Sequence, residues 1–288
     1  MGITDTFSRS WEITKKTFHV MKLDKEILLF PILSSVFSII LFLLLVFPFL
    51  LTALTVTGKA DDMYAIYLGI FGLYFISAFS ATFFNVGIVH IAKTRFQGGD
   101  ATFMDGIKIA GKHLKHIIGW SLLTATVGLL LNILESQSRK KGGVGAIIGR
   151  IAASLLGMAW AIVSIFVVPA MVIKGIGPID ALKSSVQTIK KTWGESLVRH
   201  YGLGIVRTIV SGIGVFLFLL PGIYSFFVGS MNGGFILIGI FIVYLLIVSV
   251  IFSSANTIFN TALFLYADEG KVPEYFSKEE LSHAFVKK

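Results

Sequence analysis

Asp180–Trp193, DALKSSVQTIKKTW, has a counterpart near the start of the chain in Asp5–Phe18, DTFSRSWEITKKTF. Aligned on their aspartates, both segments carry a serine five residues on and a Lys-Lys-Thr triplet near the end. Apolar side chains, with one threonine among them, recur in both at i, i+4, i+7 and i+11, which places a narrow stripe along a helix with lysines beside it. A looser third copy, Asp105–Ile118, keeps part of this stripe and is interrupted by Gly111. The repetition predicts three basic amphipathic helices.

A long apolar run follows each of these segments within a few turns. Because about 20 helical residues cross a hydrocarbon core about 30 Å thick, such runs are long enough to span a membrane. The predicted spans are Ile27–Gly58, Met63–Ala92, Ile117–Leu134, Val144–Ile173, Ser196–Tyr224 and Phe235–Ala267. Pro48 is expected to bend the first span, and Pro221-Gly222 to stop the fifth. We therefore predict an all-α polytopic membrane protein with six transmembrane helices as three hairpins, each preceded by an amphipathic interfacial helix.

The three units divide the chain into pseudo-repeats at residues 1–95, 100–175 and 178–268, followed by a short cytoplasmic tail at 269–288. Composition supports this division: 55% of the 288 residues are hydrophobic and 14% are charged. Soluble domains carry about 25% charged residues, so the sequence belongs to the membrane class. No linker is long enough to separate a soluble domain, and residues 1–288 are interpreted as a single membrane domain.

Charge indicates both the partner and the orientation. The net charge of +9 comes from Lys and Arg near the ends of the apolar runs, which favours anionic lipid as the partner over nucleic acid. Nineteen of these residues lie on the side of the termini and five on the other, Arg139, Lys140 and Lys141 among them. The positive-inside rule therefore predicts a cell-membrane protein with both termini in the cytoplasm. The basic hairpin at 139–150 is the one feature that argues the other way.

The amphipathic helices are the first candidate for function. Their tryptophans are expected at the headgroup level, and their lysines are expected to attract anionic lipid. The residues concerned are Trp11, Lys15, Lys16, Lys112, Lys115, Lys190, Lys191 and Trp193. The alternative is that these helices only orient the hairpins that follow them.

Four polar residues inside the spans form a second candidate. Asn85 and Asn260 occupy matching places near the ends of the second and sixth spans, and Asn256 lies one turn before Asn260. Buried amides in lipid need partners, so these residues either hydrogen-bond between helices or line a polar cavity for a headgroup or solute. Arg207 is the only basic residue set inside a span, where it must snorkel to the surface, pair, or bind an anion.

The fourth span carries small residues at every fourth position, which lets two helix backbones approach closely. The stripe consists of Gly145, Gly149, Ala153, Gly157 and Ala161. It is expected either to pack within the chain or to form a contact between subunits.

Several signatures are absent from the sequence. There is no cysteine, no HExxH, GxSxG or P-loop pattern, and no carboxylate in the middle of a span. His113 and His116 have a spacing that could share a metal, but Lys112 and Lys115 beside them would repel one. We therefore expect no enzyme activity, no cofactor and no metal.

The opening of the chain resembles that of a family of uncharacterised prokaryotic multi-pass membrane proteins. The likeness lies in Ser10-Trp11 and in the run Asp24–Pro31, DKEILLFP. A later segment, VPAMVIKGIGPIDALKSS, also looks like the family pattern through Val168-Pro169, Gly177, Ala181 and Ser184-Ser185. A looser likeness, confined to the third amphipathic helix, extends to the membrane domain of some glycerophosphodiesterases. The resemblance implies a six-helix membrane protein and brings no activity or catalytic residues.

These observations lead to one preferred function and two alternatives. The preferred hypothesis is a non-enzymatic membrane protein that organises anionic lipid or a partner protein as a homo-oligomer. The first alternative is a channel or carrier for a small solute or lipid, with Asn85, Asn256, Asn260 and Arg207 facing one cavity. The second is an accessory subunit of a membrane enzyme or exporter, which predicts a partner that co-purifies with it.

Overall fold

The structure, a computed structural model, describes residues 3–56, 62–141, 143–193, 202–278 and 281. In this part of the chain the regular structure is helical throughout, without a strand. The elements are α1 (Ile3–Leu23), η1 (Lys25–Leu28), α2 (Leu29–Leu41), η2 (Phe42–Val46), α3 (Phe47–Val56), α4 (Asp62–Phe96), α5 (Phe103–Lys112), α6 (Leu114–Lys141), α7 (Gly143–Val163), α8 (Val167–Lys174), α9 (Pro178–Trp193), α10 (Gly202–Gly214), η3 (Val215–Leu219), α11 (Leu220–Phe227) and α12 (Met231–Glu269).

Six helical stretches among the described residues are long and apolar enough to cross a membrane, as the sequence predicted. They are Lys25–Leu51, Ile66–Phe96, Leu114–Arg139, Gly143–Lys174, Leu203–Phe227 and Met231–Glu269. Consecutive stretches pack against each other: α2 and α3 on α4, α6 on α7, and α10 and α11 on α12. The largest contact between different pairs joins α4 to α6.

Prolines interrupt two of the stretches in the same way. η2 and η3 are wide, π-type turns, and each ends two residues before a proline, Pro48 or Pro221. Proline lacks an N–H and its ring crowds the carbonyl four residues back, so a wider turn there relieves the clash. The bend predicted at Pro48 therefore takes the form of a π turn. Pro221 does not end its helix as expected, because the same accommodation lets the helix run on to Phe227.

The fourth stretch is broken differently, by a turn between α7 and α8. The Ser185 hydroxyl, which belongs to α9, donates to the Val163 carbonyl at 2.6 Å. Its oxygen also accepts a hydrogen bond from the Phe166 backbone N–H at 3.3 Å. Ser185 is fully buried and hydrogen-bonds two backbone groups on either side of the break.

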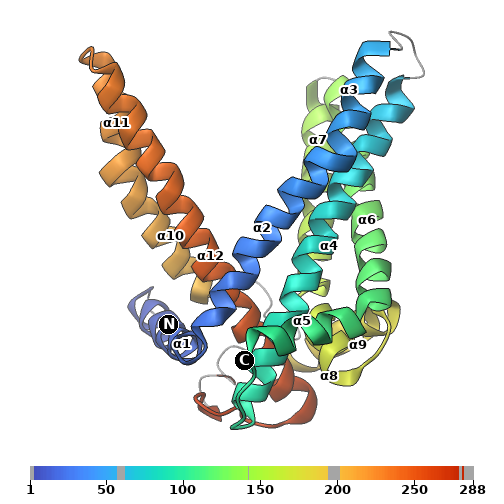
Figure 1. Cartoon of the computed structure of the whole chain (residues 1–288), viewed down its shortest axis with the longest axis vertical. Coiled ribbons are helices and arrows are strands. Elements are labelled where there is room, and N and C mark those ends of the chain that lie inside the picture. The colour runs from blue at the N-terminus through green and yellow to red at the C-terminus, as the bar shows by residue number, and fades with distance from the viewer. Residues whose placement is uncertain (1–2, 57–61, 142, 194–201, 279–280, 282–288) are drawn as a thin grey trace.

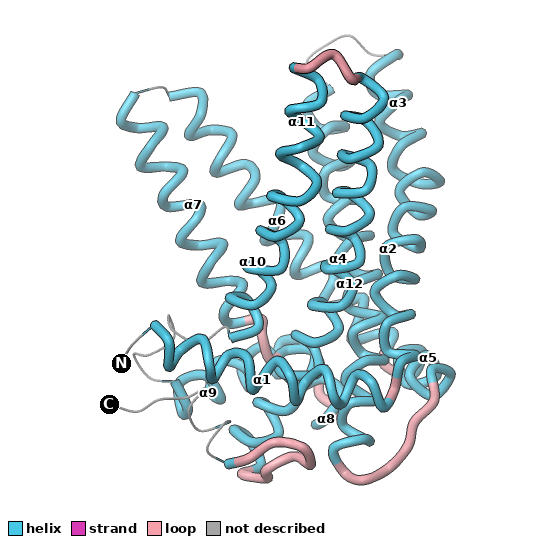
Figure 2. The backbone as a smooth tube through the Cα atoms, turned by 90° about the vertical axis from the view of Figure 1, so that its left-hand side faces the viewer, coloured by secondary structure: helices cyan, strands magenta, loops and turns pink. Residues whose placement is uncertain are grey.

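The hydrophobic core lies at one end of the molecule, which we call the base. α1, α5, α8 and α9 gather there, as Figure 2 shows, together with the last turns of α4 and α12. The largest fully buried side chains include Phe30, Phe166, Met171, Ile258 and Phe264. Away from the base the helices keep many exposed apolar side chains, and Figure 1 shows the α10–α12 pair diverging from α2 and α4. A surface of this kind suits contact with lipid.

Two boundaries differ from the sequence prediction. The amphipathic segment Asp105–Ile118 was expected to be one helix, but α5 ends at Lys112 and the residues from Leu114 onward belong to α6. The third span was expected to end at Leu134, but its helix runs on to Lys141. An ion pair between Glu135 and Arg139, one turn apart, supports this extra length.

Candidate functional site

Polar residues form a stripe on the face of α12 that turns toward α2 and α4. Ser249, Ser253, Asn256, Thr257 and Asn260 follow one another at i, i+4, i+7, i+8 and i+11, which is one side of a helix. The Thr257 hydroxyl donates to the side-chain oxygen of Asn85 in α4 at 3.1 Å. The Asn85 amide therefore hydrogen-bonds between two helices, which is one of the two roles considered for it from the sequence.

A groove of about 210 Å³ lies beside this contact, where α2, α4 and α12 meet. We call it the polar groove. It is lined by Pro31, Ser34, Ser35, Ala81, Phe84, Asn85, Leu246, Ser249, Val250 and Ser253. Four of these residues are serines and one is an asparagine, so all three helices offer hydrogen-bonding side chains, and the other lining residues are apolar. None of these described residues carries a charge.

Several hydrogen-bonding groups of the polar groove have no partner among the residues that the structure describes. The Ser35 hydroxyl donates to the Pro31 carbonyl of its own helix. In the part of the chain that the structure describes, no hydrogen bond engages the hydroxyls of Ser34 and Ser253. Both therefore remain available to a molecule in the groove.

Arg207 of α10 does not line the polar groove but contacts one of its lining residues, Ser249. A terminal nitrogen of its guanidinium donates to the Ser249 hydroxyl at 3.3 Å. Its side chain is exposed, and among the described residues no carboxylate pairs with it. Asn85 therefore lines the groove, and Arg207 contacts Ser249 in its lining. Asn256 and Asn260 do not line it, although they share the face of α12, and both are half-buried.

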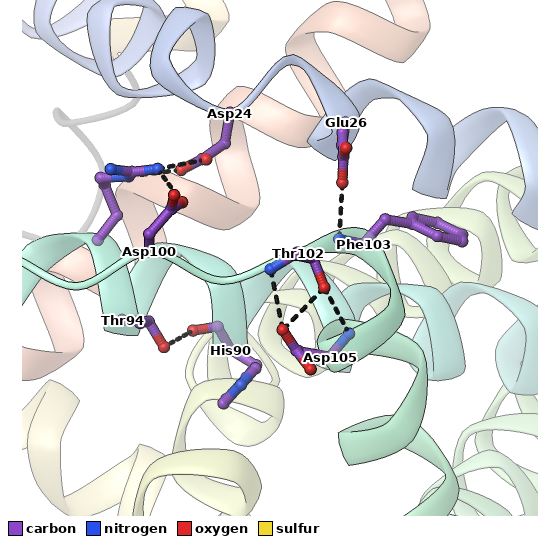
Figure 3. A network of polar contacts seen from close by, with 9 residues as sticks. Asp24, Glu26, His90, Thr94, Asp100, Thr102, Phe103 and Asp105 are labelled. Carbon is purple, nitrogen blue, oxygen red and sulfur yellow. Dashed lines mark hydrogen bonds and ion pairs between the residues drawn. The ribbon is translucent and has the colours of Figure 1, made fainter.

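A separate polar network holds the base together (Figure 3). The Arg95 guanidinium, at the end of α4, donates through two nitrogens to the two oxygens of Asp24 and also to Asp100. The Glu26 carboxylate accepts a hydrogen bond from the Phe103 backbone N–H at 2.7 Å, at the start of α5. Both acids of the Asp24–Pro31 run therefore tie η1 to the α4–α5 connection.

The start of α5 carries the capping box that its sequence indicates. The Asp105 N–H donates to the Thr102 hydroxyl at 3.3 Å, and the Thr102 N–H donates to the Asp105 carboxylate at 3.1 Å. The Thr102 hydroxyl also donates to that carboxylate at 2.8 Å. These hydrogen bonds hold the pKa of Asp105 below its usual value, because they favour the charged form.

Lys174 connects three further elements of the base. Its ammonium, at the end of α8, donates to Asp268 of α12 at 2.7 Å and to Ser184 of α9 at 2.9 Å. It also lies 5.5 Å from the centre of the Phe264 ring. This lysine therefore serves the packing of the base.

The lysines of the predicted interfacial set point outward. Those with exposed side chains are Lys15, Lys112, Lys115, Lys190 and Lys191, and Lys16 is half-buried. Trp11 is 43% exposed, and the Lys15 ammonium lies 5.5 Å from its ring. The side chain of Trp193 lies outside the described residues.

Part of each apolar stripe of α1 and α9 faces inward, whereas Trp11 of the α1 stripe is exposed. Phe18 packs edge-on against Phe252 of α12, with ring centres 5.6 Å apart. Ile189 of α9 is buried in the main core. The two helices thus bury these stripe residues on the protein's own spans and leave their lysines outside.

The small-residue stripe of α7 packs in part against α6. A Cβ added at Gly149 would lie 1.9 Å from the Ser138 hydroxyl, and one at Gly157 would lie 3.7 Å from Leu131. Ala153 is buried between them, whereas Gly145 and Ala161 are exposed. The middle of the stripe therefore serves contacts within this chain.

The sequence did not lead us to predict the four serines of the polar groove. Two of them carried a signal, because Ser249 and Ser253 continue the helical spacing of Asn256 and Asn260 toward the start of α12. Ser34 and Ser35 had no such signal, since only the folded structure brings α2 beside α12. Among the described residues, no group of three or more His, Cys, Asp or Glu could hold a metal ion.

Residues 63–274 match the family described as "Family of unknown function (DUF6159)", and the chain belongs to this family. The match includes the later segment with Val168-Pro169 and begins after the Asp24–Pro31 run. No curated protein matches the sequence.

Proposed function

We propose that this member of the DUF6159 family is a non-enzymatic protein of the cell membrane that organises anionic lipid through the basic helices of its base. In this proposal the six apolar stretches cross the bilayer as three hairpins, and α1, α5 and α9 lie along the cytoplasmic surface of the membrane. It acts as a homo-oligomer or together with a partner membrane protein.

The observation that carries the proposal is the outward position of the lysines at the level where the spans begin. α1 and α9 bury stripe residues on the protein, and Lys15, Lys190 and Lys191 are exposed. Each Lys or Arg near an anionic bilayer surface contributes about 1 kcal/mol of attraction. An exposed tryptophan among them, Trp11, suits the headgroup level.

The distribution of charge supports the orientation. The base carries most of the chain's Lys and Arg, and the positive-inside rule assigns such a side to the cytoplasm. The cytoplasmic leaflet is also the one that carries a negative surface potential. Orientation and lipid preference therefore favour the same side of the membrane.

The first test replaces Lys15, Lys16, Lys190 and Lys191 with Glu in one variant. Native mass spectrometry of protein released from nanodiscs of equal parts phosphatidylglycerol and phosphatidylcholine counts the lipids retained. We expect the wild type to be enriched in phosphatidylglycerol and the variant to lose that enrichment, because four attractive charges become repulsive.

A charge-matched control changes four basic residues to Glu on the side of α6 and α7 that lies away from the base. These residues are Arg139, Lys140, Lys141 and Arg150. This control should keep the phosphatidylglycerol enrichment. Unchanged enrichment in the first variant would exclude the proposed role of α1 and α9. The same spectra report whether the protein leaves the membrane with a second copy or with another protein.

A further inference from the structure

The polar groove between α2, α4 and α12 is a second candidate binding site, and it is separate from the surface lysines. We propose that it binds the phosphate-bearing headgroup of one glycerophospholipid, with Arg207 contacting the phosphate and the groove serines donating hydrogen bonds.

Hydrogen-bonding groups within a membrane need partners, because the surrounding hydrocarbon offers none. Ser34 and Ser253 face the groove without a hydrogen-bond partner among the described residues. Asn85 uses its side-chain oxygen for Thr257, and no acceptor in the described part of the chain takes up its amide N–H groups. These groups can all donate, so the groove suits a ligand rich in acceptor oxygens.

The charge at the groove favours an anion. Arg207 donates to Ser249 at the groove wall, and no carboxylate among the described residues neutralises it. No acidic side chain lines the groove either. A guanidinium offers several N–H donors in one plane and matches the geometry of a phosphate. A cationic solute would be repelled.

The dimensions of the groove suit a headgroup whose acyl chains remain outside. Small-molecule sites usually enclose about 300–1,000 Å³, whereas this groove encloses about 210 Å³. Figure 1 shows α12 diverging from α2 beyond it, away from the base. Many of the side chains exposed along those two helices are apolar, as at Val36 and Ile40 of α2 and Ile242 and Leu246 of α12. Acyl chains would therefore find apolar surface directly beside the bound phosphate.

The depth of the groove is compatible with a lipid of the leaflet nearest the base. Arg207 is the fifth residue of the span Leu203–Phe227, counted from the base. At 1.5 Å per residue its Cα lies about 6 Å into that span. An arginine side chain so close to the end of a helix can keep its guanidinium near the headgroup level.

The experiment measures the last lipid that the protein retains. Full-length protein is taken from nanodiscs of equal parts phosphatidylglycerol and phosphatidylcholine, stripped with increasing detergent, and weighed by native mass spectrometry. We expect one phospholipid per chain to resist stripping. Arg207→Gln should lower its occupancy about tenfold, since a hydrogen-bonded charge is lost. Arg207→Lys, which keeps the charge, should restore most of it.

A second variant fills the groove and keeps the Arg207 charge, although it removes the hydroxyl to which Arg207 donates. Ser249→Leu fills the space beside Ser253, and it should displace the same lipid while Arg207 is still present. Thr208→Val is the matched control, because the Thr208 hydroxyl is exposed and bonds only to Gly204 of its own helix. Circular dichroism and thermal unfolding identify any variant that does not fold, and such a variant is replaced by Ser253→Leu.

The outcomes separate the possible ligands. Retention of the lipid by both Arg207→Gln and Ser249→Leu would overturn the proposal. The proposal would also be overturned if inorganic phosphate displaced the lipid as readily as added phosphatidylglycerol does, because a free anion would then be the better ligand. The four-lysine variant of α1 and α9 should keep this one lipid while losing the others, so the two proposals fail independently.

Discussion

At the scale of single residues, the ring of Phe30 explains part of the Asp24–Pro31 run. A Cβ added at Gly87 of α4 would lie 2.2 Å from this ring, and one at Gly106 of α5 would lie 2.7 Å from it. Phe30 is fully buried. Two glycines from different helices thus form a notch into which the first residues of the first span insert.

We predict that Gly106→Ala destabilises the protein by about 1–3 kcal/mol, the usual cost of overpacking a core. The added methyl group would meet the Phe30 ring and also approach the Gly87 backbone, 3.2 Å away, which cannot move aside easily. Gly111→Ala in the same helix is the control, because nothing lies within 4 Å of the added Cβ. It should be neutral or stabilise by up to about 1 kcal/mol. Thermal unfolding in detergent compares the two variants; equal effects would refute the notch.

At the scale of elements, one guanidinium connects three segments of the base. Arg95 at the end of α4 binds Asp24, which precedes η1, and Asp100, which precedes α5. The Asp24 side chain is 10% exposed, whereas that of Asp100 is 81% exposed. The two ion pairs share a partner and differ in solvent access, so they should differ in their contribution to stability.

Asp24→Asn should therefore lower the free energy of unfolding by about 1–3 kcal/mol, since a partly buried charge loses its partner. Asp100→Asn should change it by less than about 1 kcal/mol, as for other exposed pairs. Chemical denaturation of the two variants side by side measures the difference. A larger effect at Asp100 would contradict the assignment of Asp24 as the link between η1 and α4.

The elements themselves were largely predictable, for physical reasons that also explain the exceptions. The period of the apolar residues indicated α1 and α9, and run length indicated all six spans. The end of α5 was not predicted, because Leu114 and Ile118 continue the apolar spacing although they belong to α6. Pro221 was expected to stop a helix, yet a π turn accommodates it. Local sequence does not reveal which of these responses a proline will cause.

At the scale of the whole molecule, the protein is packed tightly at its base and open elsewhere. The last turns of α12 lie in the core between α1, α4, α8 and α9, while its first half is mostly exposed. Such a shape leaves the bilayer to fill the spaces between the spans. Sequence could not predict it, since the contact of α12 with α4 joins residues as far apart as Asn85 and Thr257. The candidate site was accordingly predicted in part: Asn85 and Arg207 were identified, and the groove serines were not.

Quenching of Trp11 fluorescence by brominated lipids shows which lipid lies against the basic helices in an intact bilayer. Protein in vesicles that contain brominated phosphatidylglycerol or brominated phosphatidylcholine is excited at its tryptophans, and the difference between wild type and Trp11→Phe isolates the quenching of Trp11. We predict stronger quenching of Trp11 by the brominated phosphatidylglycerol, and loss of that preference when Lys15, Lys16, Lys190 and Lys191 are changed to Glu. Equal quenching by the two lipids in the wild type would contradict the account.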